Sequence, residues 1–214
     1  GRNEEGEPIK KRSALSLIKN PRFLLFLLIV FTGGIANITI NTYLFPYMKA
    51  LGAGESIMGL ALTMGTIAEL PILFFASNVM EKFKPYTLVI FSTVITCLRF
   101  LLLALTREPI LVLAIQLLNG FTFPLLSVAG VTYVDDHAPE GFRATAQGLL
   151  NGAVLGIASA VGGFSGGILF ERFGPRGMYL SFFIFITLIL MIVSLVRRTL
   201  PTENGSAPSP SRKI

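Results

Sequence analysis

Two charged side chains, Glu69 and Arg99, fall inside long apolar stretches of the sequence. An unpaired charge at the middle of a bilayer costs several kcal/mol, so each residue marks a functional site by default. A carboxylate can exchange a proton or hold a polar solute, whereas a guanidinium stays charged and needs an anion nearby. We therefore expect Glu69 and Arg99 to form one electrostatic unit. An ion pair that only fixes helix packing is the alternative.

Neutral polar side chains in two other apolar stretches extend this set. Gln116, Asn119 and Thr122 are three residues apart, so they share one face of a helix. Asn37 and Asn41 are four residues apart in an earlier stretch. Hydrogen bonding between helices would explain any one amide, but two polar stripes favour a water-accessible cavity. We predict that these five residues and the two charges line such a cavity, where they would bind a polar solute or an ion.

The stretches that carry these residues are long enough to cross a membrane. Charged residues make up 14% of the 214 residues, against about a quarter in soluble proteins, and the apolar runs are ~20 residues long. Helix-breaking residues interrupt the apolar runs and divide the chain into six predicted spans, at 21–48, 55–80, 85–106, 109–134, 139–170 and 175–196. We therefore predict an all-α membrane protein. Its six-helix bundle, 21–198, would lie between a basic linker at 1–20 and a disordered tail at 199–214.

The predicted spans place the two charges at similar depths. Glu69 is ten residues from Val79, near the end of the second span, or ~15 Å deep. Arg99 is thirteen residues from Tyr86, near the start of the third, or ~20 Å deep. The gap between these spans is short, so we expect them to be antiparallel neighbours. A direct pair near the midplane of the membrane follows from that arrangement.

Lysine and arginine residues indicate the orientation of the bundle. Thirteen of the 18 fall at the two termini or in the gaps that share their side, and four fall on the other side. Cytoplasmic segments carry the excess of basic residues. We therefore predict a multi-pass protein of the cytoplasmic membrane with both termini in the cytoplasm, embedded in the lipid bilayer.

Several spans contain small residues at regular spacing or a proline in their interior. Two stripes of small residues run along the fifth span, where they would let another helix approach closely. Their glycines, predicted to pack against a neighbouring helix, are Gly148, Gly152, Gly156, Gly163 and Gly167. Pro46, Pro71 and Pro124 lie inside spans, and each removes a backbone hydrogen bond and predicts a kink.

Several classes of protein do not match this pattern. The charge of +6 is confined to the ends and gaps, so it does not indicate nucleic-acid binding. One cysteine, Cys97, excludes an internal disulfide and a cysteine metal site, and we expect no metal or cofactor. Gly163-Phe164-Ser165-Gly166 has the shape of an intramembrane serine protease motif, but the one histidine, His137, falls in a gap between spans. We predict a transporter and not an enzyme. A non-transporting structural subunit remains the alternative.

Three motifs carry a family resemblance. They are Gly65-Thr66-Ile67-Ala68-Glu69, followed by Arg99, then the run 116–124 (QLLNGFTFP), and the loop 139–148 (PEGFRATAQG). Together they resemble the C-terminal half of the major facilitator superfamily. The branch they resemble holds the lactose permease, the phenylpropionate permease and the nucleoside–proton symporters.

The resemblance implies a fold and a set of roles. The fold would be one half of a major-facilitator-type carrier, a 3+3 inverted repeat that moves a small polar or organic solute by alternating access, coupled to protons. Glu69 would belong to the substrate site and Arg99 to the proton-coupling network. Asn119 and Thr122 stand where the lactose permease has a histidine and a glutamate, so Glu69 or a group in the other half would couple the proton. Because the chain begins at Gly1 with a linker-like segment, we expect an N-terminal six-helix half ahead of it.

Overall fold

Helices make up the parts of the chain that the computed structural model describes, residues 21–138 and 143–199. The predicted linker at 1–20 and residues 200–214 of the predicted tail lie outside these ranges. The helices are α2 (Pro21–Ala50), α3 (Glu55–Phe74), α4 (Ala76–Lys82), α5 (Pro85–Leu105), α6 (Pro109–Gln116), the 3₁₀ segment η1 (Leu117–Phe121), α7 (Phe123–His137), α8 (Arg143–Asn151), the π-helical segment η2 (Gly152–Ile157) and α9 (Ala158–Thr199).

Prolines and glycines define the ends of these helices. Helices α2, α5 and α6 each begin at a proline, where the missing N–H has no helical partner to lose. Gly52 has a φ of 81° in the turn between α2 and α3, a conformation that favours glycine. Helix α7 continues to His137, so this histidine ends a helix and does not lie in a loop as the sequence suggested.

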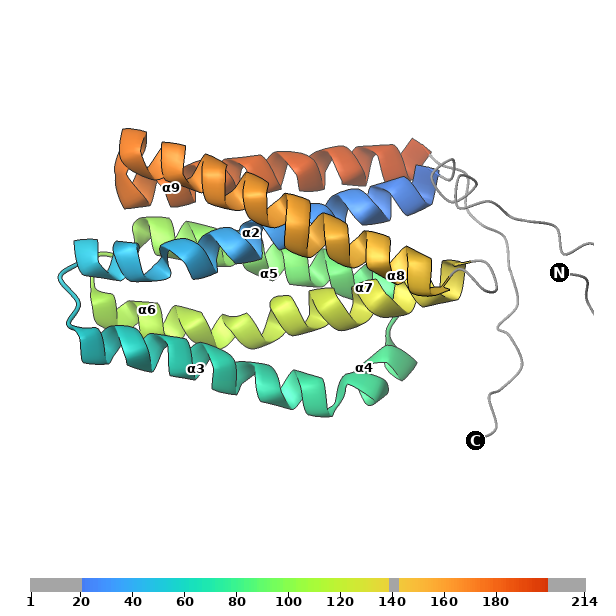
Figure 1. Cartoon of the computed structure of the whole chain (residues 1–214), viewed down its shortest axis with the longest axis horizontal. Coiled ribbons are helices and arrows are strands. Elements are labelled where there is room, and N and C mark those ends of the chain that lie inside the picture. Colours follow the sequence, from blue (N-terminus) through green and yellow to red (C-terminus); the bar gives the residue numbers. More distant parts are fainter. Residues whose placement is uncertain (1–20, 139–142, 200–214) are drawn as a thin grey trace, which may run out of the picture.

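Helix α9 contains a reversal of the chain. Its 42 residues would extend for ~63 Å, about twice the apolar thickness of a membrane. Gly174, with φ 68° and ψ 176°, breaks the helix, and Pro175 begins the second arm. Figure 1 shows the chain running back along the bundle from this point. Five stretches of the described chain have the length and hydropathy to cross a membrane, and the last of them, which includes both arms of α9, is long enough to cross twice.

The second and fourth predicted spans are each interrupted. Phe75 separates α3 from α4, four residues after Pro71. In the fourth span, η1 replaces the α-helix, and Thr122 takes a non-helical conformation before α7 begins. Both interruptions lie within four residues of a proline. The fifth span is also irregular, because η2 divides α8 from α9.

The packing of α3 differs from the expected arrangement. Its main contacts are with α6 and η1 and not with α5, although only a short gap separates α4 from α5 in the sequence. Figure 1 shows α3 and α6 side by side. Helix α9 packs against α2 and α5. The prediction that α3, with Glu69, packs directly on α5, with Arg99, is therefore wrong. Instead, η1 contacts both helices.

Candidate functional site

Arg99 is fully buried within the bundle, on α5. Its Nη1 donates to Asn119 Oδ1 at 2.7 Å and to Thr122 Oγ1 at 3.0 Å. Its Nη2 donates to Gln116 Oε1 at 2.7 Å. The guanidinium head therefore has neutral acceptors on the fourth span, which the sequence had singled out as one polar face.

Glu69 reaches Arg99 through Asn119. The Nδ2 of Asn119 donates to Glu69 Oε1, while its Oδ1 accepts from Arg99. The expected direct pair of Glu69 and Arg99 is therefore wrong in its geometry, because packing α3 on η1 inserts an amide between the charges. Glu69 is the half-buried member of this network, which we call the polar relay: Glu69, Asn119, Arg99, Gln116 and Thr122.

The 3₁₀ geometry of η1 aligns the acceptors. Side chains three residues apart eclipse one another in a 3₁₀-helix, which has three residues per turn. Gln116, Asn119 and Thr122 have this spacing, so they point together toward Arg99. The hydroxyl of Ser92, on α5, donates to the carbonyl oxygen of Thr122 at 2.7 Å and fixes the end of η1. Sequence reasoning missed Ser92, whose only signal was its place seven residues before Arg99 on an apolar helix.

Gly120 permits the contact between α3 and η1. A Cβ at this position would clash with the carbonyl oxygen of Ala68, the residue before Glu69. Gly65, one turn earlier on α3, is buried and faces the side chains of Gln116 and Asn119. Sequence reasoning did not single out Gly120, although a glycine between two polar residues of a span is a signal of close backbone approach.

Asn37 and Asn41 lie outside the polar relay. The Nδ2 of Asn41 donates to Asn37 Oδ1 at 2.8 Å along α2. Asn37 is buried and Asn41 is exposed. The structure records no hydrogen bond from this described pair to the relay, so the two polar stripes are separate.

The predicted glycine contacts are made by different residues. A Cβ at Gly148, Gly152, Gly156 or Gly163 would meet no atom within 4 Å in the described chain. The expected close packing is therefore absent from the described bundle at Gly148, Gly152 and Gly156. Gly163 contacts α2 through its carbonyl oxygen, which accepts from the hydroxyl of Tyr43 at 2.6 Å, and a Cβ on Gly167 would lie 3.0 Å from the same hydroxyl.

The close approach of α9 to α2 is made at Gly162 and Gly166. A Cβ on Gly162 would lie 2.8 Å from the carbonyl oxygen of Ile35, and one on Gly166 would lie 2.5 Å from the ring of Tyr43. The first predicted stripe crosses η2, whose π-helical turn changes the face that follows it, whereas Gly162 and Gly166 both lie beyond this turn on α9.

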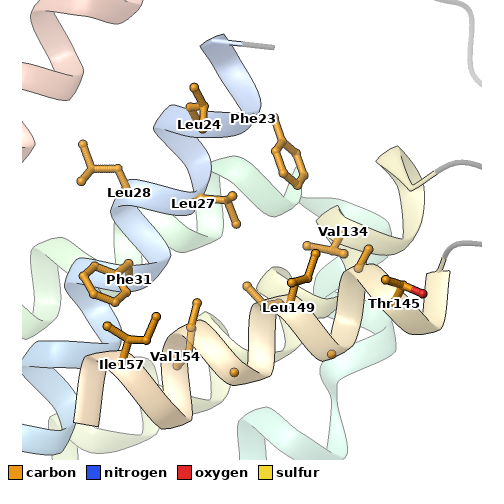
Figure 2. Close-up of a pocket in the computed structure, with 15 residues that line it drawn as sticks. Phe23, Leu24, Leu27, Leu28, Phe31, Val134, Thr145, Leu149, Val154 and Ile157 are labelled. Carbon is orange, nitrogen blue, oxygen red and sulfur yellow. The ribbon is translucent and has the colours of Figure 1, made fainter. Parts of the chain in front are cut away.

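An apolar groove of about 720 Å³ runs between α2 and the α8–η2 segment. Figure 2 shows Phe23, Leu27 and Phe31 facing Leu149 and Val154 across it. Gly148 and Gly152 also line the groove. It contains no member of the polar relay.

A helical bundle whose long stretches have the length and hydropathy to cross a membrane, with a polar relay buried between them, is typical of a membrane transport protein. The chain belongs to the MFS_1 like family, whose model matches residues 2–181, and so to the major facilitator superfamily. It is thus a multi-pass membrane protein of a transporter superfamily.

Its relatives include proteins from animals and bacteria. It is 32% identical over 183 residues to the major facilitator superfamily domain-containing protein 6-like protein A of Xenopus laevis. The matched region covers 84% of this chain and 30% of that protein. It is 28% identical to the uncharacterized transporter YwbF of Bacillus subtilis, over 86% of this chain and 48% of the relative. It is 26% identical to the xanthosine permease of Escherichia coli, over 77% of this chain and 42% of the relative. The chain therefore spans less than half the length of each.

Proposed function

We propose that this chain is the C-terminal six-helix half of a secondary transporter that moves a small polar or organic solute by alternating access, coupled to protons. Family membership supports membrane transport. Transporters of this kind bind their cargo and coupling ions near the midplane, on discontinuous helices at the interface of structural repeats. Four of the five members of the polar relay lie on the two interrupted spans, the second and the fourth, and Arg99 lies on α5 between them in the sequence.

The observation that carries the proposal is the linkage of Glu69 to a buried cation through one amide. Because Asn119 contacts both charges, protonation of Glu69 or its contact with a solute would alter the hydrogen bond from Asn119 to Arg99. The bonds of the guanidinium to Thr122 and Gln116 would remain in place. Glu69 is half-buried, so it can meet solute or water, whereas Arg99 is enclosed. We assign the proton or solute contact to Glu69 and the positioning of the fourth span to Arg99. Asn37 and Asn41 form a second polar contact for the solute on α2.

A solute with several hydrogen-bonding groups fits this set of side chains. Amides, a hydroxyl and a carboxylate offer both donors and acceptors. One relative is named as a xanthosine permease, and xanthosine carries such groups on its base and its sugar. We therefore choose nucleosides as the first solutes to test.

The partner that completes the transporter is a second six-helix half. Relatives extend well beyond the matched length. The unpacked glycines Gly148, Gly152 and Gly156 offer a smooth helix face, and two of them line the apolar groove. Small residues allow close contact of helices in a membrane. We propose that the second half packs against this face.

Uptake by cells expressing the full-length protein tests the proposal. We expect radiolabelled nucleosides, xanthosine among them, to accumulate faster at acidic external pH. Glu69→Gln should abolish this pH dependence, because an amide cannot exchange a proton. Glu55→Gln is the matched control, since Glu55 is exposed in the first turn of the same helix.

Two outcomes would contradict the proposal. Full pH-dependent uptake by Glu69→Gln would remove the carboxylate from the mechanism. No uptake of nucleosides, sugars or organic acids by a well-expressed protein would favour the structural-subunit alternative.

A further inference from the structure

Two buried polar atoms have no hydrogen-bond partner within the described chain. One is the Nε of Arg99, and the other is the hydroxyl oxygen of Tyr179, on the second arm of α9. Both side chains are fully buried. Buried polar groups are nearly always paired with protein or ordered water, so each unpaired one calls for an explanation. The two unpaired atoms lie on α5 and α9, which pack against each other, so we look for one explanation for both.

The two residues lie at similar depth in the bundle. Arg99 is six residues from the end of α5 at Leu105, which corresponds to ~9 Å, and Tyr179 is five residues beyond the break at Gly174, or ~7.5 Å. These helix ends are at the same end of the bundle, and α5 packs against α9. The ring of Tyr179 lies 5.7 Å from the ring of Phe100, the residue after Arg99.

A neighbouring tyrosine shows that the unpaired hydroxyl is a specific feature. Tyr47 is fully buried, and its ring lies edge-on to that of Tyr179 at 4.9 Å. Its hydroxyl donates to the carbonyl oxygen of Leu103 at 2.6 Å. The same environment therefore satisfies one tyrosine through the backbone and leaves the other without a protein partner among the described residues.

We propose that one buried water molecule binds between the Nε of Arg99 and the hydroxyl of Tyr179. A water oxygen can accept the Nε–H and also accept from, or donate to, the phenol. Buried waters hold two to four such bonds and satisfy polar groups that would otherwise be unpaired. The site would thus take a neutral molecule that both donates and accepts, and Tyr179 becomes a positioning residue for Arg99.

The water completes the set of contacts around the guanidinium. Nη1 and Nη2 are already committed to Asn119, Thr122 and Gln116. Fixing the Nε edge as well prevents the guanidinium from rotating, which in turn keeps Asn119 oriented toward Glu69. This consequence for transport rests on the proposed function, but the water site itself does not.

Arginine side-chain NMR tests the site without a solute. Full-length protein in lipid nanodiscs would be labelled with ¹⁵N-arginine, and the Nε–H signal of Arg99 assigned by its loss in Arg99→Lys. We expect a cross-peak between this proton and a long-lived water molecule. Tyr179→Phe should abolish the cross-peak and speed exchange of the proton with solvent. Tyr47→Phe should leave both unchanged, because its hydroxyl bonds the backbone of Leu103.

Each result decides for or against the water site. A wild-type Nε–H without a water cross-peak would overturn the proposal, as would a cross-peak that Tyr179→Phe leaves intact. If Tyr179→Phe does not fold, the wild-type cross-peak still decides whether water is bound. Failure of nucleoside uptake would not affect the spectrum, so the two proposals can fail separately.

Discussion

Asn119 lies between the two charges that the sequence made conspicuous. Charges and amides are rare in apolar spans, so Glu69, Arg99, Gln116 and Asn119 could be singled out by residue type, and Thr122 by its spacing from Asn119. Residue type also singled out Asn37 and Asn41, which lie outside the polar relay. The connections within the relay could not be predicted in this way. A direct pair was expected because spans two and three are close in sequence, but α3 packs on η1, and the amide of Asn119 contacts both Glu69 and Arg99.

Replacing Asn119 by leucine tests its bridging role. Leucine is similar in size but leaves Glu69 without its donor and Arg99 with one acceptor fewer. We expect a loss of unfolding free energy of about 3 kcal/mol, the upper range for an unsatisfied buried group. Thermal unfolding of the purified protein in detergent would measure it.

Asn41→Leu provides the matched control. Asn41 is exposed and donates only to Asn37 among the described residues, so we expect a change within about 1 kcal/mol. Equal melting temperatures for the two variants would show that the amide bridge does not stabilise the bundle.

The helices differ in how far their form could be predicted. Starts at Pro21, Pro85 and Pro109 agree with the structure, because proline has a local preference for the first turn. The 3₁₀ turn of η1 and the π turn of η2 were not predicted. Both depend on contacts with other helices, such as the bond from Ser92 to the carbonyl oxygen of Thr122, and hydropathy does not report them. The sequence predicted small-residue packing along the fifth span without naming the partner helix, and the closest approach to α2 is at Gly162 and Gly166, which were not singled out.

Gly120→Ala tests the close packing of α3 on η1. The added methyl group would meet the carbonyl oxygen of Ala68, so one of the two elements must move. Overpacking of this kind costs about 1–3 kcal/mol, and we also expect it to separate Asn119 from Glu69. The measurements are melting temperature and nucleoside uptake.

Gly59→Ala is the control for this change. Gly59 lies on α3 with no atom within 4 Å of an added Cβ, and alanine is favoured over glycine in a helix by about 0.5–1 kcal/mol. We therefore expect its melting temperature to hold or rise. A Gly120→Ala protein as stable as Gly59→Ala would show that α3 and η1 are less closely packed than described.

At the scale of the whole molecule, the two ends of the bundle differ in charge. The first residue of α2 and the last residue of α9 lie at the same end (Figure 1). Lys82, Lys84 and Arg143, in or beside the gaps between spans, belong to that end as well. We propose that this end faces the cytoplasm, as the distribution of basic residues indicates.

Single cysteines can test this orientation. In a Cys97→Ser background, Ala53→Cys should react with an impermeant thiol reagent in intact cells, because the turn after α2 would face outward. Ser206→Cys should react only after the cells are permeabilised. Labelling of position 206 but not 53 in intact cells would invert the orientation.

Bulky substitutions can test the docking of a second half. Gly152→Leu adds a side chain at a residue that lines the apolar groove, where an added Cβ would meet no atom within 4 Å in the described bundle. We expect normal expression and reduced uptake by the full-length protein. Gly162→Leu should instead lower expression, because its side chain would meet α2. Normal uptake by Gly152→Leu would exclude this face as the contact.

The order of the polar relay along the chain has a consequence for biosynthesis. Gln116, Asn119 and Thr122, which bind the guanidinium of Arg99, follow it by 17, 20 and 23 residues. When α5 leaves the ribosome, these acceptors have not yet emerged, and an unpaired arginine at the centre of a helix costs about 2.5–3.5 kcal/mol on insertion by the translocon. Only three residues, 106–108, separate α5 from α6. We therefore expect α5 and the α6–η1 segment to leave the translocon together, as one hairpin in which Arg99 is already paired.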